Sequence, residues 1–275
     1  MTCYFVGGVN RSGTTLVQGL LCSDPTTNPL IHEASYLRSV AEAYAFGKQQ
    51  FHDHNEHYFD SVEELRRFTA AWAEAFVDRV RQRYPGTEHV VLKHPPLTPR
   101  FPDLHELLDD VRLVVVVRDP RDVAASLVRV GERLRRQGRS EGRSLPRDMD
   151  RLAQYYMRCY QPALGHSDPQ YQRRLTLVRY EDLVADPSAA VARLGEATGL
   201  RLDAFDPEAA WPRDAIDHEA ARAEGNAWSS ELYGRGVSTG RVGHYVHVLS
   251  PDEIAALESA CAGPLATFGY AAARR

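Results

Sequence analysis

The stretch CYFVGGVNRSGTT at residues 3–15 decides the fold. It opens with a short apolar run that predicts a buried strand, and the leucines that follow recur at the spacing of a helix from Thr14 to Cys22. Glycine and polar residues at 8–13 join the two elements. A glycine-rich turn between a strand and a helix is the setting of a phosphate-binding loop, because backbone N–H groups and the positive end of the helix both face the anion.

The loop differs at one position from that of a nucleoside triphosphatase. Gly8 and Gly13 have the spacing of the Walker motif, but Thr14 stands where that motif has the lysine that reaches the β- and γ-phosphates. Arg11 supplies a positive charge from within the loop instead. We therefore expect the loop to hold one 5′-phosphate with its attached anion rather than a triphosphate.

Further apolar runs alternate with amphipathic segments along the chain. Strands are predicted at residues 89–93, 112–117 and 175–179, and helices at residues 61–84 and 121–134, after Asp186 and after Ser250. Capping boxes mark the helix starts at Ser61 and Ser250. The alternation predicts a single-domain, three-layer α/β fold over residues 1–275, with a parallel central sheet and a topology like that of the P-loop NTPases.

Two segments lack this regular pattern. Residues 133–147 are basic and rich in glycine and serine and are predicted to form a flexible loop, and residues about 201–240 are predicted to be irregular. The histidines within residues 50–57 do not have the spacing of a structural zinc site, so no metal is expected.

Composition argues against several classes of partner. The formal net charge of −4 gives no reason to expect nucleic acid or an anionic membrane. No apolar run approaches the roughly 20 residues of a membrane span, and the 4 cysteines lie far apart, without a CxxC pair. Because no signal peptide precedes the first strand, the protein is expected to be soluble and cytoplasmic.

A second candidate anion site follows the strand at residues 112–117. Arg118 stands at the carboxyl end of that strand, and Ser126 lies about two turns into the next helix. Arginine offers a planar fork of donors and serine a hydroxyl. Ligands of parallel sheets bind at this edge, so one ligand with two anionic groups would reach both sites. The alternative is that Arg118 pairs with Asp119 or Asp122.

Three motifs in this order resemble those of the PAPS-dependent sulfotransferases, PAPS being 3′-phosphoadenosine 5′-phosphosulfate. GGVNRSGTT at 7–15 resembles their 5′-phosphosulfate loop, VVRDPRDVAAS at 116–126 their 3′-phosphate motif, and VRYEDLVADP at 178–187 the segment with an adenine-contacting tyrosine. The resemblance extends over residues 5–258 and is closest to the branch that contains the protein-tyrosine sulfotransferases and many bacterial members. It implies an enzyme that uses PAPS as sulfuryl donor and needs no metal.

The resemblance implies a role for each matching residue. The cofactor-binding residues would be Arg11, Ser12, Gly13, Thr14 and Thr15 at the 5′-phosphosulfate, Arg118 and Ser126 at the 3′-phosphate, and Tyr180 at the adenine. Ser238 and Thr239 resemble a C-terminal serine pair that closes over the cofactor, with Ser238 on the catalytic side and Thr239 among the cofactor ligands.

Three residues are candidates for the chemistry of sulfuryl transfer. Lys93 ends the strand at residues 89–93 and, by the resemblance, would neutralise the bridging oxygen of the leaving 3′,5′-bisphosphate. Glu33 matches a glutamate of the tyrosine-sulfating branch and would take the proton of the acceptor hydroxyl if burial raises its pKa. His94 is the competing base, because an imidazole titrates near neutral pH. We favour Glu33.

The acceptor is predicted to be a hydroxyl of a small molecule or natural product, because no targeting signal directs the chain toward secreted proteins. Aromatic candidates for its pocket are Tyr36, Tyr44, Phe46, Phe51 and Trp228. Two alternatives remain: a non-catalytic protein that binds PAPS or its product, and a P-loop kinase. Lys93 beside Glu33 or His94 argues against the first, and Thr14 argues against the second.

Overall fold

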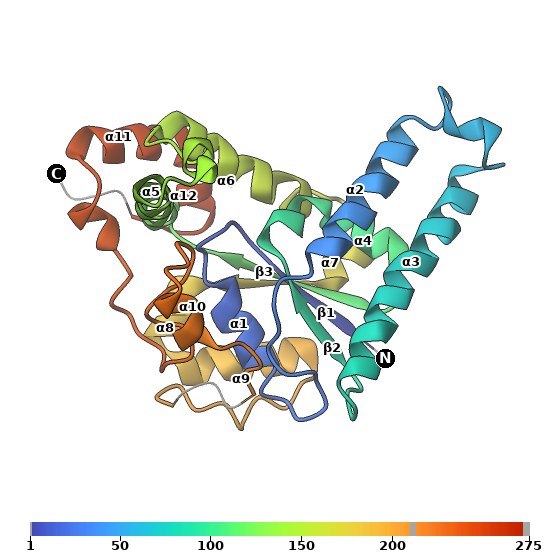
Figure 1. Ribbon diagram of the computed structural model, residues 1–275, viewed down its shortest axis with the longest axis horizontal. Helices are drawn as coiled ribbons and strands as arrows, with labels where there is room; N and C mark the ends of the chain where they lie inside the picture. Colours follow the sequence, from blue (N-terminus) through green and yellow to red (C-terminus); the bar gives the residue numbers. More distant parts are fainter. Residues whose placement is uncertain (1, 210–212, 272–275) are drawn as a thin grey trace.

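A sheet of parallel strands lies at the centre of the protein, in the order β2-β1-β3-β4 (Figure 1). The strands are β1 (Cys3–Gly7), β2 (Val90–Lys93), β3 (Val111–Val117) and β4 (Leu175–Arg179). This computed structural model describes residues 2–209 and 213–271. The pairing of β1 with both β2 and β3 brings their carboxyl ends to one edge of the sheet.

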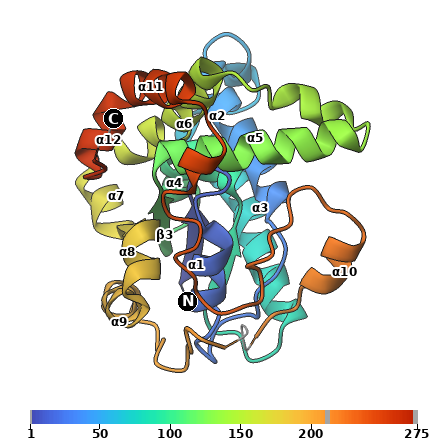
Figure 2. The ribbon, with the colours of Figure 1, turned by 90° about the vertical axis from the view of Figure 1, so that its left-hand side faces the viewer.

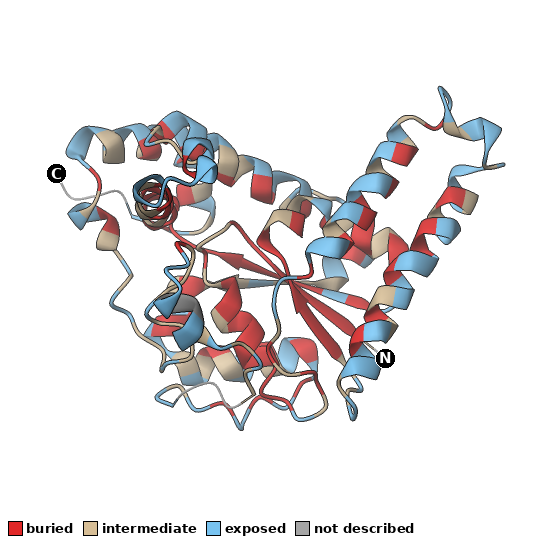
Figure 3. Cartoon of the chain, in the orientation of Figure 1, coloured by how far each residue is buried: buried red, intermediate tan, exposed pale blue. Residues whose placement is uncertain are grey.

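Alternate side chains of each strand enter two different cores, as the two-residue period of a strand requires. On β1, Cys3 and Phe5 belong to the larger core, and Tyr4 and Val6 belong to the smaller one. Because both faces of β1, β2 and β3 are covered, these strands are apolar along almost their whole length, whereas the edge strand β4 is half-buried and its Leu177 is exposed. Figure 3 shows this burial as a continuous buried centre beneath exposed helical surfaces.

Helices form the two outer layers. The larger core packs against α2 (Ser35–Gln49), α3 (Val62–Arg83), α4 (Phe101–Leu107), α5 (Pro120–Arg136), α6 (Met149–Leu164), α7 (Pro169–Arg174), α11 (Pro251–Ala260) and α12 (Ala262–Thr267). The smaller core packs against α1 (Thr14–Leu21), α8 (Tyr180–Ala185) and α9 (Pro187–Thr198). Short helices are η1 (Asn55–His57), η2 (Pro95–Arg100), η3 (Ser140–Ser144), α10 (His218–Ala223) and η4 (His244–His247). The three-layer α/β fold with a parallel sheet is therefore confirmed.

The predicted elements are present with small shifts at their ends. The strand at residues 175–179 has the predicted bounds, and α11 begins with the complete capping box of Ser250 and Glu253. At the start of α3 the Ser61 hydroxyl accepts from the Glu64 N–H at 3.2 Å. The Glu64 carboxylate, however, accepts from the Asp60 N–H at 2.7 Å rather than from Ser61, so the predicted box is displaced by one residue.

The expected loop at residues 133–147 is more ordered than predicted. Its first four residues continue α5 to Arg136, and η3 follows. Arg135 Nη1 donates to the carbonyls of Gly142 and Leu145, each at 3.0 Å, so a single guanidinium ties the connection to the helix. The segment 201–240 is irregular apart from α10, and residues 210–212 lie outside the described part. Among the described helices, none has the length and apolar character needed to cross a membrane.

Truncation of Leu113 measures the contribution of the central strand. Its side chain on β3 is fully buried, so Leu113→Ala should lower the free energy of unfolding by about 2–5 kcal/mol, measured by urea denaturation. The neighbouring Arg112 is exposed, and Arg112→Ala should change that free energy by less than about 0.5 kcal/mol. Equal effects of the two substitutions would contradict the difference in burial between these neighbouring side chains.

Candidate active site

The loop after β1 has the backbone of an anion-binding turn. Gly8 and Gly13 have φ values of 141° and 100°, and Arg11, at 75°, is a non-glycine residue in the left-handed region. A Cβ on Gly13 would lie 2.5 Å from the Tyr180 ring, so this position also requires glycine for space. Thr14 and Thr15 open α1, and N–H groups of a first helical turn have no carbonyl partner within the helix. The loop can therefore present N–H donors to an anion.

Ser12 is buried within the turn of the phosphate loop. Its side chain is fully buried, and its N–H donates to the Val9 carbonyl at 3.1 Å. A Cβ on Gly8 would meet the Ser12 hydroxyl oxygen at 2.6 Å, so this hydroxyl points into the loop. The predicted contact of the Ser12 hydroxyl with a ligand stays a prediction, and the structure gives Ser12 a part in closing the turn.

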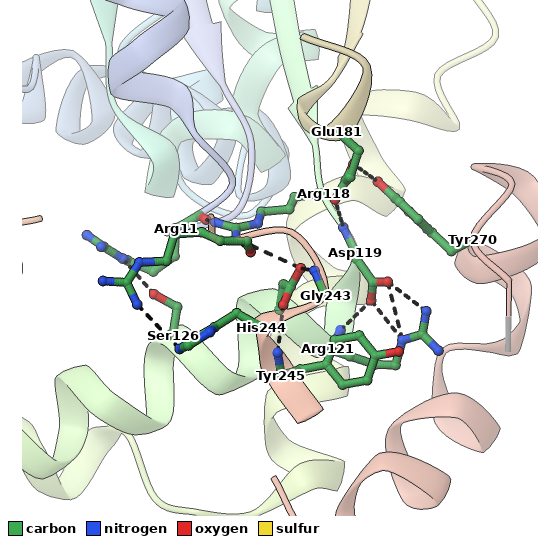
Figure 4. A network of polar contacts seen from close by, with 12 residues as sticks. Arg11, Arg118, Asp119, Arg121, Ser126, Glu181, Gly243, His244, Tyr245 and Tyr270 are labelled. Atoms are coloured by element: carbon green, nitrogen blue, oxygen red, sulfur yellow. Dashed lines mark hydrogen bonds and ion pairs between the residues drawn. The ribbon is translucent and has the colours of Figure 1, made fainter. Parts of the chain in front are cut away.

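Arg118, directly after β3, connects the two candidate anion sites. Its Nη1 donates to the Arg11 carbonyl at 3.0 Å and its Nη2 to the Arg241 carbonyl at 2.5 Å. Its guanidinium carbon lies 4.3 Å from the centre of the Tyr180 ring. Figure 4 shows Arg11 and Arg118 side by side at this edge of the sheet. Arg11, Arg118 and Tyr180, which the sequence singled out from three separate motifs, thus lie together.

The two aspartates near Arg118 mainly serve other partners, and Figure 4 shows Asp119 facing Arg121. Asp119 Oδ2 lies 2.7 Å from Nη2 of Arg121. Asp122 accepts the N–H groups of Gly243 and Tyr245 at 2.8 and 2.9 Å, while its Oδ2 lies 3.9 Å from Nη2 of Arg118. Burial raises the pKa of Asp122, and the Arg118 charge offsets part of that rise. The two aspartates therefore leave much of the Arg118 charge for a ligand.

A cavity of about 410 Å³, the arginine cavity, opens beside Arg118. Its lining includes six arginines (Arg11, Arg118, Arg129, Arg133, Arg235 and Arg241), two carboxylates (Asp122 and Glu231), and Gly13, Ser126, Tyr180, Tyr233 and Ser238. The Nε atoms of Arg118 and Arg133 are buried without a hydrogen-bond partner. Burial, together with Arg11 and Arg129, lowers the pKa of Arg133. Such an excess of positive charge fits a ligand with more than one anionic group.

Some of these arginines were not identified in the sequence. Arg129 and Arg133 follow Ser126 at intervals of three and four residues on α5 and so share one face of that helix. That spacing could have identified both of them. Arg241 belongs to the irregular C-terminal segment, which Figure 2 shows in front of α1, and no local pattern marks it.

Arg11 joins groups that the sequence assigned to different ends of a ligand. Its Nε donates to the Ser126 hydroxyl at 3.0 Å, and its Nη1 donates to the Trp228 carbonyl at 2.7 Å and to the Tyr233 hydroxyl at 3.0 Å. The side chain therefore reaches from the phosphate loop to α5 and to the segment that covers both.

Lys93, at the end of β2, forms an ion pair with Glu33. The Lys93 Nζ lies 2.8 Å from Glu33 Oε1 and 3.3 Å from the Thr15 hydroxyl, and His94 Nδ1 lies 2.9 Å from Glu33 Oε2. Burial acts to raise the pKa of Glu33, but the contacts with His94 and Lys93 outweigh it and lower that pKa to about 2. The condition that burial raises the pKa is therefore not met, because two neighbours stabilise the carboxylate.

A second cavity of about 370 Å³, the Lys93 cavity, contains this ion pair. Its lining includes Lys93, Glu33, Thr14, Thr15, Trp228 and Tyr233, with Arg11, Asn10, Ile31, His32, Pro95, Pro96, Ile216, His218, Asn226 and Ser229. His94 is buried behind Glu33 and is not part of that lining. Arg11 and Tyr233 line both cavities, so the two are neighbours.

Most of the remaining predicted residues lie outside the Lys93 cavity. Ser238 lines the arginine cavity instead, and Thr239 is exposed and lines neither. Of the five aromatic candidates only Trp228 is in the lining of the Lys93 cavity. Tyr44 and Phe51 are in the hydrophobic core, and Tyr36 and Phe46 are exposed, so helical packing and surface position account for these four.

The fold and the two cavities define a class of protein: a P-loop-like α/β protein with an arginine-lined cavity next to an ion-paired lysine. Residues 4–204 match the sequence profile described as "Sulfotransferase family". Since this match covers most of the chain, the protein belongs to the sulfotransferase family, whose sulfuryl donor is PAPS.

A mouse protein and several solved structures are similar to the chain. Carbohydrate sulfotransferase 5 of Mus musculus is 32% identical over 126 residues, which cover 42% of this chain and 32% of that protein. The match thus spans about a third of the relative's length. The sulfotransferase domain from the curacin biosynthetic pathway has a TM-score of 0.58, 15% identity and 99% coverage of both chains. A Mycobacterium avium sulfotransferase has a TM-score of 0.55, 17% identity, and coverage of 99% of this chain and 78% of its own. These structures support the fold alone.

Arg133 tests whether the arginine cavity is built for anions. Arg133→Met removes a buried unpartnered nitrogen and a charge among like charges, so it should raise the free energy of unfolding by about 1 kcal/mol. It should also reduce the increase in Tm that inorganic pyrophosphate produces in the wild type. Arg136→Met, on the exposed end of the same helix, is the control and should change neither quantity. A destabilised Arg133→Met variant with an unchanged pyrophosphate effect would be evidence against an anion site.

Proposed function

We propose that this protein transfers the sulfuryl group of PAPS to a hydroxyl of a small molecule. The observation that carries the proposal is the hydrogen bond from Arg118 to the Arg11 carbonyl at 3.0 Å, which joins two anion sites beside the Lys93–Glu33 ion pair. A ligand with a 3′-phosphate and a 5′-phosphosulfate has two separated anions, and this arrangement matches that chemistry. A protein that only binds such a ligand has no need of the ion pair.

PAPS would bind mainly through the arginine cavity. Arg118 and Ser126 would contact the 3′-phosphate, and Tyr180, beneath the Arg118 guanidinium, would contact the adenine. Arg11 and the N–H groups of the phosphate loop would contact the 5′-phosphosulfate. The buried, unpartnered Nε atom of Arg118 supports this fit, because a phosphate oxygen would supply the missing acceptor. Ser238 and Thr239 are proposed to close over the bound nucleotide.

Lys93 would stabilise the leaving group. Sulfuryl transfer resembles phosphoryl transfer in that positioning and electrostatics provide most of the catalysis. The Lys93 ammonium is buried beside Thr15 of the phosphate loop, where it can follow the charge that develops on the bridging oxygen. The Glu33 carboxylate, 2.8 Å from Lys93 Nζ, compensates the buried positive charge before the leaving group forms.

Glu33 is our candidate for the group that accepts the proton of the acceptor hydroxyl. Its carboxylate lines the Lys93 cavity, and its low pKa keeps it ionised throughout the physiological range. When Lys93 contacts the bridging oxygen of PAPS, Glu33 would keep His94 as its remaining partner. The loss of the Lys93 contact would increase the basicity of the Glu33 carboxylate. His94 would act through Glu33 as a positioning residue, since its Nδ1 faces the carboxylate.

The acceptor class rests on the chemistry of the residues that line the Lys93 cavity. Trp228, Pro95 and Pro96 provide apolar surface, and Asn226 and Ser229 provide neutral polar groups. A small neutral alcohol fits such a lining. The name of the mouse relative adds a sugar hydroxyl to the natural-product hydroxyls already considered. The likeness to the tyrosine-sulfating branch, through Glu33 and the lysine before His94-Pro95, adds a phenol.

Binding of 3′,5′-adenosine bisphosphate tests the donor site directly. In EDTA, calorimetric titration should show that the wild type binds the bisphosphate at least about tenfold more tightly than 5′-AMP, since each charge-assisted contact contributes about 1.5–3 kcal/mol. Arg118→Ala should abolish that preference. Arg112→Ala, at the other end of β3, should retain it. Equal affinity of the wild type for the two nucleotides would contradict the sulfotransferase proposal. ATP turnover that requires magnesium would favour the alternative of a P-loop kinase.

Glu33→Gln tests the proposed base. With PAPS and a panel of phenols and sugars, bisphosphate release should fall by about 10²–10⁴-fold, while affinity for the bisphosphate should stay within about twofold. Glu42→Gln, on the exposed face of α2, is the matched control and should retain wild-type turnover. If Glu33→Gln keeps most of its activity and His94→Ala loses it, His94 is the base instead.

A further inference from the structure

Tyr233 lies where the arginine cavity and the Lys93 cavity meet, and it lines both. Its hydroxyl oxygen accepts a hydrogen bond from Arg11 Nη1 at 3.0 Å, and its side chain also hydrogen-bonds to Thr15. The Thr15 hydroxyl is 3.3 Å from Lys93 Nζ. The phenol oxygen is thus in contact with the groups that we propose to surround the 5′-phosphosulfate.

Several contacts fix the position of the phenol ring. The Tyr233 N–H donates to the Ser230 carbonyl at 3.2 Å, and Gly234 follows with a φ of 71° that turns the chain back. The ring packs on the His218 imidazole, with 5.4 Å between ring centres. His218 is itself held by Asp214, whose Oδ2 lies 2.8 Å from His218 Nε2. The hydroxyl is therefore preorganised, which is what electrostatic catalysis requires.

The surroundings also make this phenol a strong donor. A tyrosine hydroxyl has one O–H to donate and can accept hydrogen bonds at its oxygen. Burial acts to raise the pKa of Tyr233, but the charges of Arg11 and Lys93 outweigh it and lower that pKa. An N–H that donates into the phenol oxygen polarises the O–H and strengthens the hydrogen bond that the hydroxyl gives in turn.

We infer that Tyr233 is a further catalytic residue, which donates its O–H to an oxygen of the transferring sulfuryl group. The inference rests on the proposed sulfuryl transfer. In that step the acceptor oxygen forms the new S–O bond while the S–O bond to the 5′-phosphate breaks. The acceptor proton moves to Glu33, and the electron pair of the broken bond moves to the bridging oxygen beside Lys93. Tyr233 keeps its proton throughout and stabilises the charge on a non-bridging oxygen.

In a competing interpretation, Tyr233 weakens the binding of PAPS instead of strengthening it. Since its hydroxyl already contacts Arg11 and Thr15, the phenol could instead occupy the place of an anion and would have to leave before PAPS binds. A blocking phenol weakens the binding of every nucleotide that enters the site. A donor to the sulfuryl group strengthens the binding of PAPS alone, because 3′,5′-adenosine bisphosphate lacks that group.

Calorimetric titration without an acceptor separates the two interpretations. PAPS and 3′,5′-adenosine bisphosphate are each titrated in EDTA into the wild type, Tyr233→Phe and Tyr245→Phe. Tyr233→Phe should weaken PAPS binding by about tenfold, the effect of one hydrogen bond to a charged group, and leave bisphosphate binding within about twofold. Tyr245→Phe is the matched control, because its ring packs under Arg121 and not at either cavity, and it should change neither affinity.

Two results would overturn the role of Tyr233. Unchanged PAPS affinity in Tyr233→Phe would show that the hydroxyl does not contact the sulfuryl group, and a gain in affinity for both nucleotides would identify the phenol as a block. Failure of the wild type to bind either nucleotide would overturn the proposed function and this inference with it. That failure is recognised before any variant is compared. Unchanged Tm values of the two variants confirm that folding is not the cause of a loss.

Discussion

The parallel pairing of β1 with β2 and β3 is the constraint on which the site depends. Val6 pairs with Lys93 on one side of β1, and Gly7 pairs with Val115 on the other. The phosphate loop, Lys93 and Arg118 therefore leave the sheet at the same edge. A shift of one residue in either pairing would turn each strand's side chains to the opposite face, and it would separate Lys93 from Thr15 and Arg118 from the Arg11 carbonyl.

Charge is distributed unequally over the two cavities that this edge creates. The arginine cavity has far more guanidinium groups than carboxylates, and main-chain carbonyls of Arg11 and Arg241 accept from Arg118. A carbonyl satisfies a donor without cancelling its charge, so the positive potential persists for a ligand. In the Lys93 cavity Glu33 compensates the lysine, and Arg11 is the one arginine among the described residues of the lining, so far less positive charge faces that space.

The sequence predicts those parts of the site whose local pattern determines their position. The phosphate loop, Arg118 and Lys93 all follow apolar runs, and their place at one edge follows from a parallel sheet. The segment with Trp228, Tyr233 and Arg241 has no periodicity, and side chains more than a hundred residues away hold it through its carbonyl groups. The pKa of Glu33 also depends on His94 and Lys93, which are distant in the sequence, so burial alone gave the wrong direction.

The hydrogen bond from Arg118 to the Arg11 carbonyl also holds the phosphate loop against the end of β3. Neither the loop nor the Arg118 side chain can move away from the other without breaking this hydrogen bond. In the proposed PAPS site, the distance between the two phosphate positions is thus set by the protein before any nucleotide arrives. A bisphosphate whose phosphates are separated differently, such as a 2′,5′ isomer, would satisfy one site at the expense of the other. Discrimination between nucleotide isomers by the proposed site would then follow from this spacing, which the parallel sheet and the Arg118 contact set together.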